Sequence, residues 1–159
     1  MVNLVLISLI SMLTAACVAS QAAHAQPAPP EPPAAYDAEL AKSLGGNDNG
    51  MRSYVLVILK TGPKKVPAGP DRDKMFKGHF ANIERLASEK KLMFAGPLDG
   101  VEGRRGIFIF ATPEIEAARG WVATDPVIIN GEMVAEYHVL FGSAALMALP
   151  GIHAKISKK

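Results

Sequence analysis

The sequence predicts an α+β domain with the ferredoxin-like plan, in which two helices cover one face of a four-stranded antiparallel sheet. Three observations lead to this fold class. Four short apolar segments, rich in β-branched and aromatic residues, have the length of strands. Two segments between them have helical periodicity. The resulting order is strand, helix, strand, strand, helix, strand, which is the order of this fold.

Each predicted strand is flanked by turn-forming residues. Residues 53–60, SYVLVILK, form a continuous apolar run that is typical of a buried strand. Residues 92–96 and 107–111 are the second and third strands, and the turn-rich stretch LDGVEGRRG joins them. Residues 132–141, EMVAEYHVLF, are the fourth strand.

The helices are predicted from periodicity and from their boundary residues. The first long helix covers residues 71–91, with acidic residues early and two lysines in its last turn, as the helix dipole favours. The second begins with Pro113 as its first residue and runs through residue 122, before the Asp-Pro pair at 125–126. A helix in the C-terminal tail is expected to be interrupted at Pro150-Gly151.

Residues 1–25 are predicted to be a signal peptide, so that the mature chain is exported to the periplasm or secreted. Residues 4–16 are uncharged and mostly apolar, which is shorter than the roughly 20 residues of a membrane-spanning helix. Ala23-His24-Ala25 has the small-x-small pattern of a cleavage site. A lipoprotein modified at Cys17 ranks second, because Thr14 stands where Leu is usual, and an uncleaved anchor ranks third. No membrane association is expected after cleavage unless Cys17 is lipidated.

The remainder divides into a proline-rich linker with a short helix (26–50), a folded domain (51–146) and a C-terminal tail (147–159). The net charge is +2 and basic residues occur as isolated pairs, so nucleic acid is not an expected partner. Cleavage removes the single cysteine, so neither a disulfide nor a thiol nucleophile is expected. The sequence contains no phosphate-binding loop, dinucleotide fingerprint or nucleophilic serine motif, and no cofactor is predicted.

The predicted strands carry apolar residues on both of their alternating faces, as YVLVIL in residues 54–59 and IFIF in residues 107–110 show. Two helices cover only one face of a sheet, and a face that is open to water normally alternates with polar residues. We therefore expect a second copy of the chain to cover the other face. This predicts a homodimer whose sheets pack face to face.

A histidine lies within an apolar stripe of the first long helix. Phe76, His79, Ile83 and Leu86 are spaced by three, four and three residues, so they line one face of the helix. A neutral imidazole in such a place can accept a proton near neutral pH. The alternative is a structural core histidine whose hydrogen bonds are satisfied.

The stretches YVLVILKTGP, GHFANIERLASEKKLMFAGPLDG and GIFIFATPEIEAARGWVATDPVIINGEMVAEYHVLFGSAAL together resemble the YciI-related (YCII) proteins, and secreted members most closely. The resemblance covers residues 53–146. It implies a dimeric α+β barrel of ferredoxin-like subunits. It also implies that His79 and Asp125, the aspartate of the Asp-Pro pair, meet in a cleft and form an active site. It does not imply a particular substrate.

Further side chains are candidates for binding a substrate in such a cleft. Phe76 and Ile83 flank the histidine on its helix, and Tyr137 and His138 point to opposite faces of the last strand. Ordinary packing is the alternative for the two strand residues, and capping of the next turn is an alternative role for Asp125. A metal site made of the two histidines and the aspartate is the weaker interpretation, because their spacing has no metal signature, and no metal is predicted.

Two functions fit these residues. In the first, the protein is a small exported enzyme in which His79, oriented by Asp125, acts as general acid and base on a small organic substrate. Isomerisation or elimination is the expected chemistry, because the sequence offers neither a nucleophile nor a cofactor motif. In the second, the same dimer binds a small ligand or has a structural role, and its cleft performs no chemistry.

Overall fold

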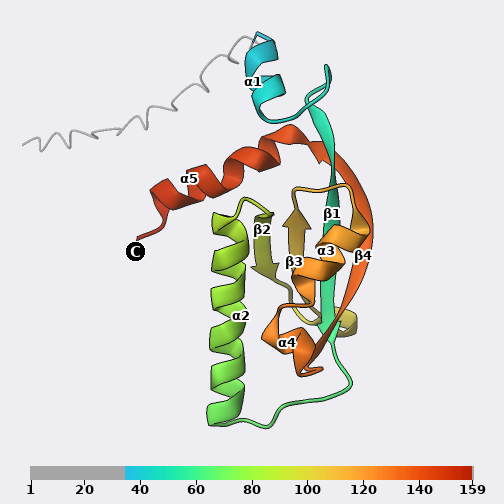
Figure 1. Ribbon diagram of the computed structural model, residues 1–159, viewed down its shortest axis with the longest axis vertical. Helices are drawn as coiled ribbons and strands as arrows, with labels where there is room; N and C mark the ends of the chain where they lie inside the picture. The colour runs from blue at the N-terminus through green and yellow to red at the C-terminus, as the bar shows by residue number, and fades with distance from the viewer. Residues whose placement is uncertain (1–34, 159) are drawn as a thin grey trace, which may run out of the picture. The chain divides into compact units, whose positions relative to one another are not determined.

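The computed structural model describes residues 35–158, so the predicted signal peptide, Cys17 and most of the proline-rich linker lie outside the described residues. Four strands form one antiparallel sheet in the order β2-β3-β1-β4 (Figure 1). With α2 after β1 and α3 after β3, the chain has the predicted order of elements, and the ferredoxin-like α+β fold is confirmed. The strands are β1 (Met51–Thr61), β2 (Leu92–Pro97), β3 (Arg104–Phe110) and β4 (Met133–Ser143). The helices are α1 (Ala38–Ser43), α2 (Pro70–Ser88), α3 (Ile115–Val122), α4 (Pro126–Ile129), α5 (Leu149–Ile156) and the short 3₁₀ helices η1 (Val101–Gly103) and η2 (Ala144–Ala148).

Helix α2 ends earlier than the sequence pattern predicts. It stops at Ser88 because Lys90 adopts a left-handed conformation with φ of 56°. The N–H groups of Lys90 and Lys91 then donate to the carbonyl oxygens of Ala87 and Leu86, each at 3.0 Å. These two bonds close the helix in a Schellman motif, so the two lysines lie after the helix and not in its last turn.

Two further boundaries differ from the prediction. Helix α3 begins at Ile115 and not at Pro113, because the Thr112 hydroxyl accepts a hydrogen bond from the N–H of Glu114 at 3.1 Å and holds a turn there. Helix α5 continues through Pro150-Gly151 without interruption. Pro150 lies in the first turn of α5, where its nitrogen needs no helical hydrogen bond.

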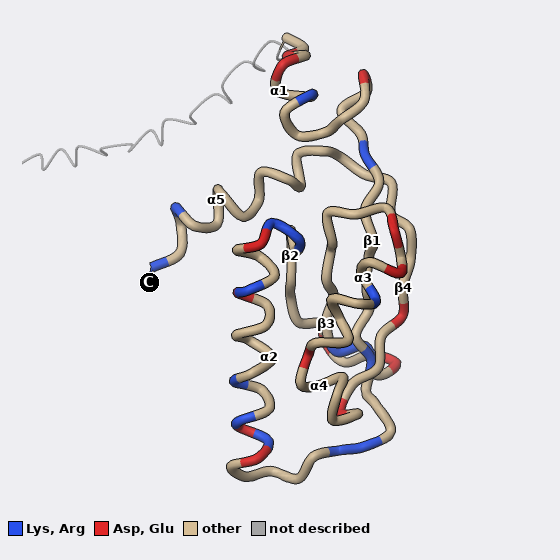
Figure 2. Tube along the Cα trace, in the orientation of Figure 1, with Lys and Arg blue, Asp and Glu red and all other residues tan. Residues whose placement is uncertain are grey.

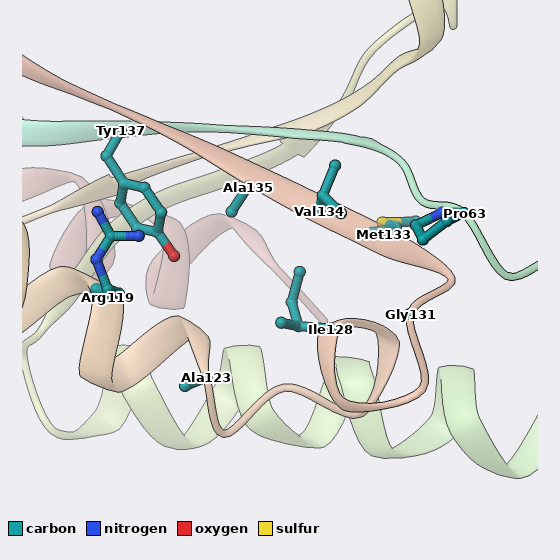
Figure 3. A pocket seen from close by; sticks show the side chains of 9 residues that line it. All are labelled: Pro63, Arg119, Ala123, Ile128, Gly131, Met133, Val134, Ala135 and Tyr137. Atoms are coloured by element: carbon teal, nitrogen blue, oxygen red, sulfur yellow. The ribbon is translucent and has the colours of Figure 1, made fainter.

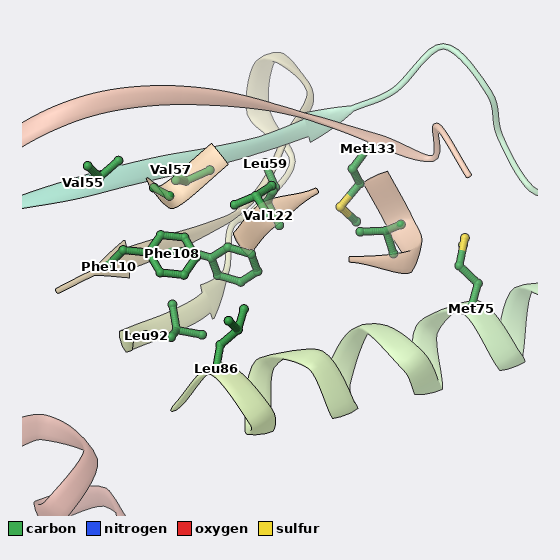
Figure 4. Packing of buried hydrophobic residues seen from close by; sticks show 12 residues of the cluster. Val55, Val57, Leu59, Met75, Leu86, Leu92, Phe108, Phe110, Val122 and Met133 are labelled. Carbon is green, nitrogen blue, oxygen red and sulfur yellow. The ribbon is translucent and has the colours of Figure 1, made fainter. Parts of the chain in front are cut away.

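The hydrophobic core lies between the sheet and helices α2, α3 and α4 (Figure 4). Val55 and Val57 of β1 are fully buried and stand opposite Phe110 and Phe108 of β3. Leu86 of α2 packs against this cluster from the helix side. Burial of a side chain of this size stabilises the fold by about 1.5–3 kcal/mol, so this layer fixes α2 against the sheet.

The other face of the sheet is also apolar where β1 and β3 form it, as the sequence pattern predicts. Leu56 lies opposite Ile109 and Ile58 opposite Ile107, and these pairs alternate with the core residues. All four are half-buried, and Val134 of β4 beside them is 43 % exposed. We call this surface the open face, defined by Leu56, Ile58, Ile107, Ile109 and Val134. Its occupation by a second copy of the chain stays a prediction.

Basic and acidic residues both occur along α2 and around the ends of the strands (Figure 2). Within residues 35–158, no helix combines the length and the apolar character that a membrane span requires.

A buried carboxylate holds the segment between β1 and α2. Glu132 is 3 % exposed and accepts hydrogen bonds from the N–H of Val66 and from Arg72, both at 2.7 Å, with Arg105 at 4.0 Å. Burial raises the pKa of Glu132, but the Val66 N–H and the two guanidinium groups outweigh it, so the pKa lies below its ordinary value. Because Arg72 belongs to the first turns of α2, this cluster fixes where that helix begins.

Candidate active site

His79 and Asp125 are in contact between α2 and the start of α4. The imidazole Nδ1 lies 2.9 Å from Oδ1 and 2.8 Å from Oδ2 of the carboxylate. His79 is 7 % exposed and Asp125 is fully buried. A buried carboxylate is tolerated only when it is paired and hydrogen-bonded, and Nδ1–H is the donor that faces it here.

Asp125 also caps the short helix α4, which is the alternative role that the sequence suggests for it. Its Oδ1 accepts a hydrogen bond from the N–H of Val127 at 3.1 Å. Pro126 occupies the first turn, where its fixed φ suits a helix start. The two contacts therefore coexist, and the cap helps to fix the carboxylate relative to the backbone.

Asn82, which the sequence analysis does not single out, joins the same buried group. It is 7 % exposed, and its Nδ2 lies 3.5 Å from Oδ2 of Asp125. The amide oxygen accepts hydrogen bonds from Arg85 at 2.7 Å and from the Thr124 hydroxyl at 3.0 Å. Two donors on that oxygen orient the amide so that its NH₂ group faces the carboxylate.

A glycine permits the close approach of α2 and α4. A Cβ atom on Gly78 would lie 2.9 Å from Cγ of Pro126, which is nearer than side chains normally approach. Gly78 immediately precedes His79, and Pro126 immediately follows Asp125. The absent side chain therefore lets the two helices come close enough for the imidazole and the carboxylate to meet.

Three aromatic rings surround the imidazole. The ring centroids of Phe76, Phe80 and Phe108 lie 6.1, 5.4 and 6.2 Å from that of His79. Within residues 35–158, Nε2 of His79 makes no hydrogen bond. Arg52 Nε is the one side-chain nitrogen or oxygen of that part that is both fully enclosed and without a partner, so Nε2 keeps some contact with solvent.

The buried face of α2 differs from the predicted stripe. Its buried residues are Met75, His79, Asn82 and Leu86, whereas Phe76 and Ile83 are half-buried at its edge. All four residues of the predicted stripe are buried or pack against the core, but the most buried face is rotated slightly from it about the helix axis. Phe76 still contacts the imidazole, and the binding role of Phe76 and Ile83 stays a prediction.

The two strand candidates do not lie together. Tyr137 lines a hollow between β4 and the α3–α4 segment, and His79 does not line that hollow (Figure 3). His138 is exposed and lies opposite Leu56, on the open face. The sheet thus separates His138 from Asp125, so these two side chains cannot bind one metal ion together. The described residues contain no cluster of three or more histidine, cysteine or acidic side chains suited to a metal ion.

A family model for the YCII-related domain matches residues 51–141, which is more than half of the chain. This span includes both members of the buried pair and all four strands up to Phe141. A search of curated proteins found no match. The fold and the family match agree with the resemblance that the sequence motifs suggest, and the chain belongs to the family of proteins with a YCII-related domain.

Proposed function

We propose that this protein is an exported enzyme of the isomerase or lyase type, in which His79 transfers a proton to and from a small organic substrate. The observation that carries the proposal is the buried contact of Nδ1 with both oxygens of Asp125, at 2.9 and 2.8 Å. This contact assigns the Nδ1 proton to the carboxylate side. It leaves the lone pair of Nε2 free to act as a base.

The chemistry follows from that tautomer. When Nε2 takes a proton from carbon next to a carbonyl group, the imidazole becomes a cation, and the adjacent carboxylate stabilises it. Returning the proton to another atom of the substrate gives an isomer, and losing a leaving group gives an elimination product. Phe76, Phe80 and Phe108 lie next to the ring, and at 7 % exposure the ring has little contact with water.

A second candidate function, a dimer that binds a ligand or is purely structural, is favoured by a different observation. His79 is only 7 % exposed, and it lines neither the hollow beside Tyr137 nor a second hollow beside Phe76 and Phe80 on the outer side of α2. A substrate would therefore need a local rearrangement to reach Nε2. A core histidine that only holds α4 in place needs no such opening.

Solvent-exchange NMR distinguishes the two functions. The mature protein is incubated in D₂O with a panel of small oxo acids, lactones and enol ethers, and deuterium incorporation at carbon is measured. A general base of this kind contributes about 10²–10⁴-fold to a rate, so His79→Gln should lower the exchange rate by at least about 100-fold. His153→Gln, which changes an exposed histidine of α5, should leave it unchanged.

Far-UV circular dichroism of each variant shows whether it is folded. Exchange that persists in folded His79→Gln would exclude His79 as the base. Absence of exchange with every compound of the panel would favour the ligand-binding or structural function.

A further inference from the structure

A hollow of about 330 Å³ lies between β4 and the segment that joins α3 to α4 (Figure 3). Its volume is in the range of small-molecule sites, and such sites combine an apolar lining with a few polar groups. Ala123, Ile128, Met133 and Ala135 provide the apolar lining. Arg119 and Tyr137 provide a guanidinium group and a phenol at the same hollow.

The guanidinium group of Arg119 contacts Tyr137 and Glu116 but keeps free hydrogen-bond donors. Its central carbon lies 4.5 Å from the centroid of the Tyr137 ring, and its Nε donates to Glu116 at 3.3 Å. Within residues 35–158, its two terminal amino groups make no hydrogen bond. This position over the ring keeps the guanidinium beside the hollow, and its terminal amino groups can bind a carboxylate with two parallel hydrogen bonds.

The phenol of Tyr137 offers a second donor beside the first. Figure 3 shows its hydroxyl group directed away from β4 toward the helices. Within residues 35–158, no hydrogen bond engages this hydroxyl. Burial raises the pKa of Tyr137 and Arg119 opposes this less strongly, so the phenol is protonated at neutral pH and can donate.

We propose that this hollow binds a small organic anion, namely a carboxylate with a compact apolar body. The carboxylate accepts from the terminal amino groups of Arg119 and from the Tyr137 hydroxyl, while the apolar body lies on Ile128 and Ala135. Glu116 competes for Arg119 only weakly, because its side chain is 82 % exposed and surface ion pairs of this kind contribute little. The site is separate from the proposed acid–base pair, because neither His79 nor Asp125 lines it.

The proposed dimer leaves this hollow accessible. Tyr137 lies opposite Val57 and Ala135 opposite Leu59, so both point to the face of the sheet that the helices cover. The open face, where a second copy of the chain is expected, lies on the other side of the sheet, and Val134 at the edge of β4 is its one residue that also lines the hollow. A second copy of the chain on the open face would therefore leave the hollow free for a small ligand.

The test is a titration of the full mature protein with benzoate, followed by NMR of the methyl groups of Ile128, Met133 and Ala135. Benzyl alcohol, which has the same ring without the charge, is the matched ligand control. We expect benzoate to shift these methyl signals saturably and benzyl alcohol to bind at least about tenfold more weakly, as the loss of one charge-assisted hydrogen bond implies.

Three variants test whether benzoate binds in this hollow. Arg119→Gln should weaken benzoate binding about tenfold. Arg104→Gln, which removes an exposed arginine paired with Glu102 outside the hollow, should leave it unchanged. Ala123→Leu, which adds a side chain at the exposed rim, should block binding while Arg119 is kept.

Three results would overturn the proposal. They are the absence of methyl shifts with benzoate, equal affinity for benzyl alcohol, and unchanged affinity in folded Arg119→Gln. His79→Gln is expected to bind benzoate like the unmodified protein, so this proposal and the acid–base proposal fail independently.

Discussion

Replacement of Gly78 by alanine tests whether the absent side chain is what lets α2 meet α4. Alanine in place of glycine inside a helix normally stabilises a protein by about 1 kcal/mol. At Gly78, however, the new Cβ would lie 2.9 Å from Cγ of Pro126. Carbon atoms pack best at about 3.5–4.0 Å, so α4 must move by about 0.6–1.1 Å or the proline ring must shift.

The expected change in the free energy of unfolding follows from these two opposing effects. An extra methyl group forced into a packed contact costs about 1–3 kcal/mol. After the gain in helix propensity is subtracted, Gly78→Ala should range from neutral to about 2 kcal/mol less stable than the unmodified protein. Gly120 of α3 is the matched control, because nothing lies within 4 Å of a Cβ placed there. Gly120→Ala should therefore stabilise the protein by about 1 kcal/mol.

Urea unfolding measures both variants, and NMR of the imidazole protons of His79 reports its contact with Asp125. We expect the free energies of unfolding of the two variants to differ by about 1–3 kcal/mol, with Gly78→Ala the less stable. Its Nδ1 proton should also exchange faster with solvent, because a displaced α4 moves the carboxylate away. Equal stabilisation by both substitutions, with an unchanged Nδ1 signal, would refute the reasoning.

Three further predictions concern stability, assembly and processing. Because the folded pKa of Glu132 lies below its unfolded value, its stabilising contribution is complete above about pH 4.5 and is lost as the pH falls through the folded pKa. Glu132→Gln should therefore be less stable at pH 7 and lose less stability on acidification, which urea unfolding at several pH values measures. The open face should hold a homodimer, so light scattering should give a dimer mass for the unmodified protein and a monomer mass for Ile107→Glu; a monomeric unmodified protein would contradict this. Mass spectrometry of the exported product should find Gln26 at its amino terminus, whereas a lipid-modified Cys17 would show that the lipoprotein alternative is correct.

The sequence predicts the sheet well because strand patterns are local. The apolar run at residues 53–60 falls within β1, and residues 107–111 overlap β3. The boundaries that it misses depend on single backbone conformations. The left-handed Lys90 ends α2 early, and the side chain of Thr112 delays α3. A polar lysine and a threonine carry no periodic signal, so such endings are visible only in the folded chain.

The candidate site is harder to predict, because its partners are distant along the chain. His79 and Asp125 are 46 positions apart, so their contact follows from a family resemblance and not from spacing. The two candidates on the last strand show the same difficulty. Alternation correctly places Tyr137 and His138 on opposite faces of β4, but it does not tell which face holds the buried pair.

The rotation of the α2 stripe has a physical explanation in its polar residues. The predicted stripe counts apolar residues and one histidine, so it selects Phe76 and Ile83 and passes over Asn82. In the structure, His79 and Asn82 are neighbours on the buried face, because residues three apart lie together on a helix. Both side chains are buried, and buried polar groups are normally hydrogen-bonded, so both need polar partners. Asp125 is the partner that they share. Its carboxylate accepts hydrogen bonds from the imidazole, from a backbone N–H of α4 and, at 3.5 Å, from the Asn82 amide. Asn82, three residues after His79, is therefore the residue that shifts the predicted stripe to the observed buried face.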